Sequence, residues 1–194
     1  MPLPTVYRKS AEPSIASYSY TDIAEGTGVQ QFYLCSSEIV GTVNDYHLVE
    51  NVIYSDALTL AFNDGVSQDF DLTAFNMPKV IKGTGILQIA HRQAGAGGTA
   101  WGSVVLKKYS GTTETTIVGV ISPTITAAVE GVWNMPITIP QTHFKRGDIL
   151  RLTISGANTD TGMLTIGFDP QNRASAGVMT ITQSSIFIPF KLDL

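Results

Sequence analysis

From Thr142 onward the chain alternates between apolar and polar side chains, and this pattern limits the possible folds more than any other feature of the sequence. In the stretch Asp148–Ser155, the apolar residues Leu150, Leu152 and Ile154 alternate with polar ones. A period of two residues is the period of a β-strand that buries one face. The chain closes on another apolar stretch, so we expect its C-terminus to be docked within a sheet.

Further stretches of this kind follow one another along the chain, and turn sequences separate them. The predicted strands are Gln30–Cys35, Leu48–Ser55, Leu58–Phe62, Gln68–Phe75, Gly85–His91, Trp101–Tyr109, Thr115–Ile121, Val132–Ile139, Asp148–Ser155, Met163–Phe168 and Met179–Phe190. The predicted turns are Asn63-Asp64-Gly65, Lys82-Gly83-Thr84-Gly85, Ser110-Gly111-Thr112 and Asp160-Thr161-Gly162. This spacing predicts an all-β fold, an antiparallel β-sandwich of jelly-roll type.

Two local patterns add detail to this fold. Asn63-Asp64-Gly65 lies between two predicted strands and indicates a hairpin. In the last strand the apolar positions change parity, which predicts a bulge near Gln183-Ser184-Ser185.

The first 28 residues differ from the rest of the chain and are interpreted as an extended N-terminal arm, followed by a single β-sandwich domain over residues 29–194. The arm contains Tyr7, Ile15, Tyr18 and Tyr20. This aromatic content is unlike a disordered tail, so we expect the arm to pack on its own domain or on a neighbour. The four residues are the predicted anchors of such a contact.

Charged residues are scarce in this sequence, and this scarcity limits which partners can be expected. Charged residues make up 14% of the chain, against about 25% in typical soluble domains. The net charge is −4, so no positive field would attract nucleic acid. A surface with so few charges tends to associate, which favours a protein that works within an assembly.

The sequence also bears on the compartment. Cys35 is the single cysteine, so no internal disulfide can form, and a reducing compartment is expected. We expect Cys35 to be a small buried side chain. The N-terminus has no signal-peptide pattern, and no apolar stretch is long enough to span a membrane.

No residue pattern predicts catalysis. The histidines are isolated from one another, and no Gly-x-Ser-x-Gly nucleophile elbow occurs. Asp69 and Asp71 lie two residues apart and resemble a glycosidase pair, but we favour a solvated strand edge. The prediction is therefore a protein that is not an enzyme and needs no cofactor and no metal.

Aromatic residues give one alternative, a binding site for sugars. Trp101 and Trp133, with Tyr109, could form a platform on which sugar rings stack. Against this, each lies at a strand position where an aromatic side chain is usually part of the core.

Three stretches together resemble small virion structural proteins of tailed bacteriophages, the auxiliary or decoration proteins that cover a capsid. They are Asp22–Val29 with Phe32-Tyr33, then Phe168-Asp169-Pro170-Gln171-Asn172-Arg173, and the terminal Ile188–Leu194. The resemblance implies a jelly-roll-like sandwich that assembles as a homotrimer, binds the major capsid protein, and is located in the virion after assembly in the host cytoplasm. It carries no catalytic motif.

A competing interpretation is a receptor- or glycan-binding module of a virion tail or fibre. The Lys145-Arg146-Gly147-Asp148 turn before a strand fits trimeric sandwich heads of that kind. Loss of binding in Trp101→Ala or Trp133→Ala would favour this interpretation, whereas stabilisation of capsids against heat would favour a decoration protein.

Overall fold

The computed structural model describes residues 28–37, 45–62, 65–94, 98–126, 128–159 and 163–192. Within these ranges it contains strands and no helix, so the predicted all-β fold is confirmed. The strands are β1 (Gly28–Ser37), β2 (Asp45–Val49), β3 (Thr59–Phe62), β4 (Ser67–Leu72), β5 (Lys79–Ala94), β6 (Ala100–Ser110), β7 (Thr113–Ile121), β8 (Glu130–Phe144), β9 (Ile149–Asn158), β10 (Met163–Gly167) and β11 (Ser185–Leu192).

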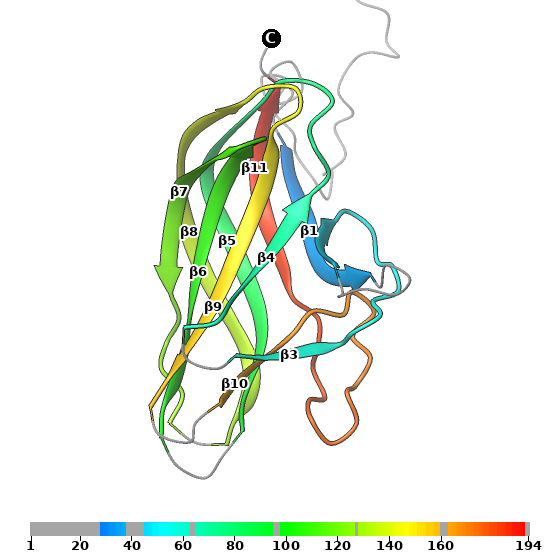
Figure 1. The fold of residues 1–194 in the computed structure, drawn as a ribbon, viewed down its shortest axis with the longest axis vertical. Helices are drawn as coiled ribbons and strands as arrows, with labels where there is room; N and C mark the ends of the chain where they lie inside the picture. Colours follow the sequence, from blue (N-terminus) through cyan, green and yellow to red (C-terminus); the bar gives the residue numbers. More distant parts are fainter. Residues whose placement is uncertain are drawn as a thin grey trace, which may run out of the picture.

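The strands form one continuous sheet that folds over into two layers (Figure 1). One layer runs β8–β5–β11–β1 and the other runs β2–β4–β9–β6–β7, while β10 and β3 extend the sheet from one end of β5. β1 belongs to both layers, because Gly28–Tyr33 pairs with β11 and Tyr33–Ser37 pairs with β2. The pairing is antiparallel as predicted, except that β2 and β4 are parallel.

The core lies between the two layers and follows from the alternation in the sequence. Leu150, Leu152 and Ile154 are fully buried, while their neighbours on β9 point outward. Aromatic rings fill the widest parts of the core. Tyr46, Phe70 and Phe168 form one edge-to-face cluster, and a second joins the rings of Phe32, Phe190, Phe75 and Phe144. Such edge-to-face pairs stabilise a core beyond the apolar area that they bury.

Several predicted details are wrong, each for a reason that lies in long-range pairing. The hairpin around Asn63-Asp64-Gly65 does not form: β3 pairs with β10, and β4 lies between β2 and β9. The predicted turn Lys82–Gly85 lies inside β5, where Gly83 has φ 127° and the register shifts between Ile81 and Gly83. A glycine at such a φ makes a bulge rather than a chain reversal.

The last strand also differs from its prediction. β11 begins only at Ser185, and its irregularity lies between Phe187 and Phe190 rather than at residues 183–185. The preceding residues form a loop that crosses the end of the core. The predicted turns at Gly111 and Gly147, both with positive φ, are confirmed.

Phe168–Arg173, one of the three stretches behind the resemblance, organises the loop between β10 and β11. Asp169 is fully buried, and its carboxylate accepts hydrogen bonds from the backbone N–H and the guanidinium of Arg173, at 2.7 and 2.9 Å. The Arg173 guanidinium stacks 3.8 Å from the Tyr54 ring. The side-chain amide oxygen of Asn172, a residue with φ 53°, accepts hydrogen bonds from the backbone of Thr182. This stretch therefore has a structural role in holding the loop.

Candidate interaction surfaces

The outer face of the β8–β5–β11–β1 layer carries no charge over most of its area. The strand segments that form it are 29–33, 84–90, 132–138 and 185–189, and none contains Asp, Glu, Lys, Arg or His. Phe187 of β11 lies beside Ile86 of β5, which lies beside Pro136 of β8. Ile86 is 45% exposed, and Val29 at the edge of the face is 66% exposed. Pro136, Ile86 and Phe187 thus form an apolar row across β8, β5 and β11, while on β1 the residue beside Phe187 is Gln31, and Val29 lies beside Pro189.

A second row on the same face is made of amides and hydroxyls that hydrogen-bond to one another. Gln31 donates to Ser185 Oγ at 3.1 Å, and the Gln88 amide donates to Asn134 Oδ1 at 3.1 Å. Ser185 Oγ in turn lies 3.4 Å from Gln88 Oε1. Because these polar groups already have partners, burying them against another surface costs less than burying groups that rely on water.

The outer face of the other layer is built around a cation. The guanidinium of Arg151 on β9 contacts Asp71 at 2.6 and 2.7 Å and Asp69 at 3.3 Å on β4, and Glu114 at 3.2 Å on β7. Lys107 contacts the other oxygen of Glu114 at 2.9 Å. The hydrogen bonds to Asp71 raise the pKa of Arg151, so it stays charged.

These contacts correct the interpretation of Asp69 and Asp71. β4 is an internal strand with β2 and β9 on its two sides, so the two acids do not mark a strand edge. Both carboxylates bind Arg151, although they also line a shallow pocket with Asp45, Tyr46, His47 and Gln68, so their first role is in this ion-pair network. Within the part of the chain that the structure describes, no group of three or more His, Cys, Asp or Glu could hold a metal ion.

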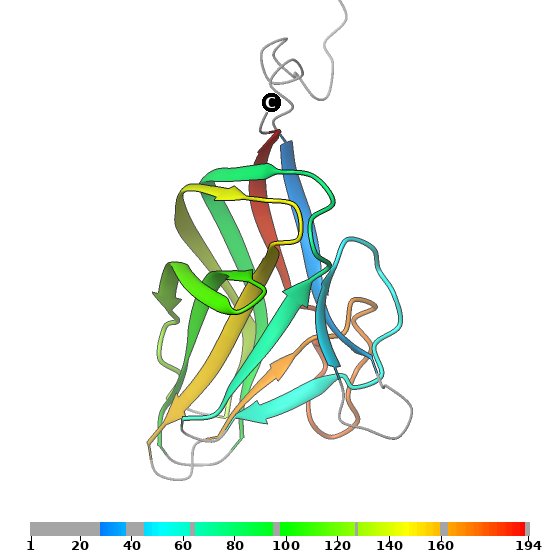
Figure 2. The same cartoon turned by 45° about the horizontal axis from the view of Figure 1, so that its top comes forward.

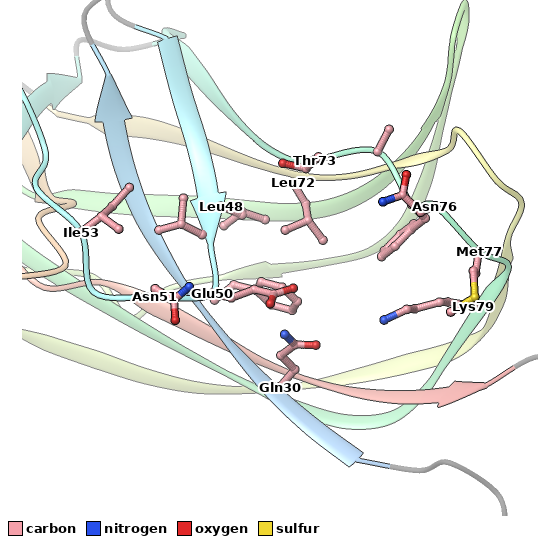
Figure 3. Close-up of a pocket in the computed structure, with 14 residues that line it drawn as sticks. Gln30, Leu48, Glu50, Asn51, Ile53, Leu72, Thr73, Asn76, Met77 and Lys79 are labelled. Atoms are coloured by element: carbon pink, nitrogen blue, oxygen red, sulfur yellow. The ribbon is translucent and has the colours of Figure 1, made fainter.

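A groove opens where the two layers separate beside β1 (Figure 3). Its volume is about 530 Å³. The buried side chains of Phe32, Leu48, Leu72 and Phe75 form its floor. The exposed side chains of Ile53 and Met77 lie toward its two ends, and the amides of Gln30, Asn51 and Asn76 surround it. Glu50 and Lys79 also line the groove, so it has an apolar floor and a rim of amides and charged groups.

The structure separates the two predicted glycan-binding tryptophans. Trp133 points into the core, is 7% exposed, and stacks on His91 with ring centroids 4.1 Å apart. Trp101 is partly exposed and points outward, because its neighbour Gly102 faces Trp133 inside the core. The two indoles do not share a surface, and the predicted platform does not form. The other predicted site residues, Tyr7, Ile15, Tyr18 and Tyr20, lie outside the described residues.

Two buried groups have shifted pKa values. Burial, with smaller contributions from Asp56 and Asp169, raises the pKa of the Cys35 thiol to about 11, in agreement with its predicted buried position. Burial lowers the pKa of His91 to about 4, against a smaller opposing effect of Glu130. His91 Nδ1 has no hydrogen-bond partner, so the ring is neutral at pH 7.

The sequence analysis missed the uncharged face and the groove. The four uncharged segments are visible in the sequence, but uncharged stretches of this length are ordinary in a chain with 14% charged residues. Their adjacency depends on strand pairing that no local pattern shows.

No helix in the described ranges is long and apolar enough to cross a membrane.

No protein-family model and no curated protein matches this chain. Solved structures with a similar fold include an α-amino acid ester hydrolase, with a TM-score of 0.60, 10% identity, and coverage of 84% of this chain and 36% of that chain. An aminopeptidase from the marine sediment archaeon Thaumarchaeota archaeon has a TM-score of 0.60 and 7% identity over 86% of this chain and 37% of that chain. A CocE/NonD family hydrolase from Staphylococcus aureus has a TM-score of 0.58 and 10% identity over 85% and 36%.

These neighbours overturn the prediction that the chain is not an enzyme, because the fold also occurs within chains that are hydrolases. That prediction equated a missing catalytic motif with a missing activity, and a fold does not decide function in either direction. The chain spans little more than a third of the length of these hydrolases. At 7–11% identity the likeness shows the fold alone.

Proposed function

We propose that this chain is an assembly protein of a phage virion, which binds the capsid surface as an auxiliary or decoration protein and stabilises the shell. Its partner is the major capsid protein or another virion protein, and it assembles as a homo-oligomer, a trimer in the simplest arrangement. The observation that carries the proposal is the uncharged outer face of the β8–β5–β11–β1 layer.

Two properties of this face support a binding role. Depletion of charge with retention of apolar and amide side chains is typical of the centre of a protein interface. The Gln31–Ser185 and Gln88–Asn134 hydrogen bonds satisfy its polar groups before any partner arrives. The face is one side of four paired strands, and this extended surface suits a lattice of repeated protein surfaces better than a small ligand.

The glycan-binding alternative loses its support, because Trp133 is in the core and Trp101 stands apart from it. The chain contains only these two tryptophans, so no other pair of indoles could form the platform.

The test uses capsids that lack this protein and measures its binding by co-sedimentation, together with the temperature at which the shells open. Wild-type protein should bind with saturation and raise the opening temperature. Ile86→Glu and Pro136→Glu place a carboxylate in the apolar row and should weaken binding at least about tenfold, because that charge would be buried without a partner.

Ile121→Glu is the matched control. Ile121 lies at the end of β7 in the other layer and is 70% exposed, so its replacement adds the same charge to an exposed apolar site elsewhere. It should bind capsids like wild type. Equal binding by the Ile86→Glu and wild-type proteins would reject the uncharged face as the docking surface, and absence of wild-type binding would reject the proposed function.

A further inference from the structure

Among the described strands, none pairs with the first residues of β1 on the side away from β11. β2 ends at Val49, which lies opposite Tyr33, so β2 covers only the second half of β1. Leu34 N–H donates to the carbonyl of Ser184 at 3.1 Å, toward the β11 side. In an antiparallel strand successive residues direct their backbone groups to opposite sides. Val29 and Gln31 therefore direct N–H and C=O away from β11, toward the groove.

The groove occupies the place that a longer β2 would fill. β2 lies between β1 and β4 where it is present, and past Val49 the chain turns away through Glu50 and Asn51. On the far side β4 ends at Leu72 and continues as Thr73–Phe75 along the groove. Figure 3 shows β1 and the end of β2 diverging around the space, with Leu48 and Leu72 directed into it. The gap thus has the position and the backbone edge of one missing strand.

A strand that entered this gap would need a particular composition. Its inward side chains would meet the floor formed by Phe32, Leu48, Leu72 and Phe75, so they should be apolar or aromatic. Its outward side chains would lie among the amides and the charged groups of Glu50 and Lys79 at the rim, and should be small and polar. Adding a strand to an open edge gives affinity through main-chain hydrogen bonds and specificity through alternate side chains.

We propose that this groove binds residues 16–20 of the N-terminal arm of a second copy of the chain, as an added β-strand. Ser17-Tyr18-Ser19-Tyr20 alternates hydroxyl and aromatic side chains, so both tyrosines can face the floor while both serines face the rim. Residues 14–20 contain no charge. This inference rests on the proposed function, because it assumes that copies of the chain assemble with one another.

The place where the arm joins the domain favours exchange between copies. The arm ends at Gly28, the first residue of the strand with the open edge. Its 27 preceding residues can span up to about 90 Å when extended, enough to reach a neighbouring groove. If each copy gives its arm to the next and the rotation between copies is one third of a turn, the exchange closes into the trimer of the proposed function.

The test is a photo-crosslinking experiment on the full-length chain in solution. Unlabelled protein carries p-benzoylphenylalanine in place of Tyr18 and is mixed with ¹⁵N-labelled wild-type protein before irradiation. Mass spectrometry should find hybrid crosslinks that join the unlabelled arm to labelled residues 49–53 or 72–79. Crosslinks only within one chain, crosslinks elsewhere on the surface, or no crosslinks would each overturn the proposal.

Variants with substitutions in the groove provide the second part of the test. Ile53→Glu combined with Met77→Glu in the labelled chain should reduce the hybrid crosslink at least about tenfold, because both side chains are exposed at the groove and the new charges oppose entry of an uncharged strand. Val66→Glu, a change at a 46% exposed residue away from the groove, should leave it unchanged. An undiminished crosslink in the groove variant would contradict the proposal. Because no capsid is present, this result is independent of the capsid-binding test.

Discussion

The two outer faces of the sandwich are made of the same kind of strand and differ in how their side chains are satisfied. On the β2–β4–β9–β6–β7 face, Arg151 joins carboxylates from β4 and β7, so residues distant in sequence are bound together within one chain. On the β8–β5–β11–β1 face, apolar and amide side chains extend across the strands without a charge.

The two faces therefore contribute to different free energies, one to folding and the other to association. A charged network that includes Arg151 contributes to the folded chain itself, and its ions prefer to remain in contact with water. A face that exposes Ile86 and Val29 gains when those side chains leave water. The first face thus stabilises the fold, and the second is suited to association. Figure 2 shows the two layers from a second direction.

Lowering the pH should give the largest change in the free energy of unfolding, and the two layers should respond over different pH ranges. His91, inside the β8–β5–β11–β1 layer, has a pKa of about 4 against 6.5 when unfolded. Between these values the unfolded chain binds a proton that the folded chain does not, so stability should fall as pH falls from about 6.5 to 4, by up to about 3 kcal/mol. Urea unfolding at several pH values measures this dependence.

The control for this titration is His91→Phe, which keeps a ring against Trp133 and removes the ionisable group. It should lose the pH dependence between 6.5 and about 4.5. Below that range the charged face should contribute, because the hydrogen bond from Lys107, with the further contacts of Arg151, lowers the pKa of Glu114. A slope unchanged in His91→Phe would show that another group is responsible.

Removal of the Arg151 guanidinium should give the second largest loss in the free energy of unfolding. Arg151→Met leaves Asp69, Asp71 and Glu114 near one another without a partner, and we expect a loss of about 2 kcal/mol in the free energy of unfolding. Lys107→Met removes a single contact with exposed Glu114 and should cost less than about 0.5 kcal/mol. Equal losses in the two variants would argue against a network centred on Arg151.

The smallest effect on folding is expected on the uncharged face. Ile86→Thr retains a β-branched side chain at a 45% exposed position, so the free energy of unfolding at low protein concentration should change by less than about 0.5 kcal/mol. Sedimentation of the same variant should nevertheless show weaker self-association or capsid binding. A large loss of monomer stability would mean that this face also stabilises the fold, and it would contradict the assignment of folding to one face and association to the other.

The fold class and most strand positions could be predicted because alternation is a local property. Leu150, Leu152 and Ile154 show the inward face of β9 without knowledge of its neighbours. The pairing of β3 with β10 joins residues about a hundred positions apart, and no local turn signal indicates it. The turn residues near Asn63 therefore suggested the wrong hairpin partner.

The candidate surfaces could be predicted only in part. The uncharged segments are visible in the sequence, but the register that places Phe187 beside Ile86 is not. Trp133 looked like a binding residue because an aromatic side chain serves a core and a surface equally well. The groove depends on the point at which β2 ends, and the predicted strand Leu48–Ser55 had extended past that point.

β1 is the strand through which the chain before Gly28 joins the domain, and it is hydrogen-bonded to both layers. A force that pulls on the arm along β1 is resisted by the ladders to β11 and β2 in shear, so that several hydrogen bonds share the load at once. Such a geometry resists mechanical extraction better than a strand that peels from an edge one bond at a time. A pull on the N-terminal end therefore loads β1 through both ladders at once.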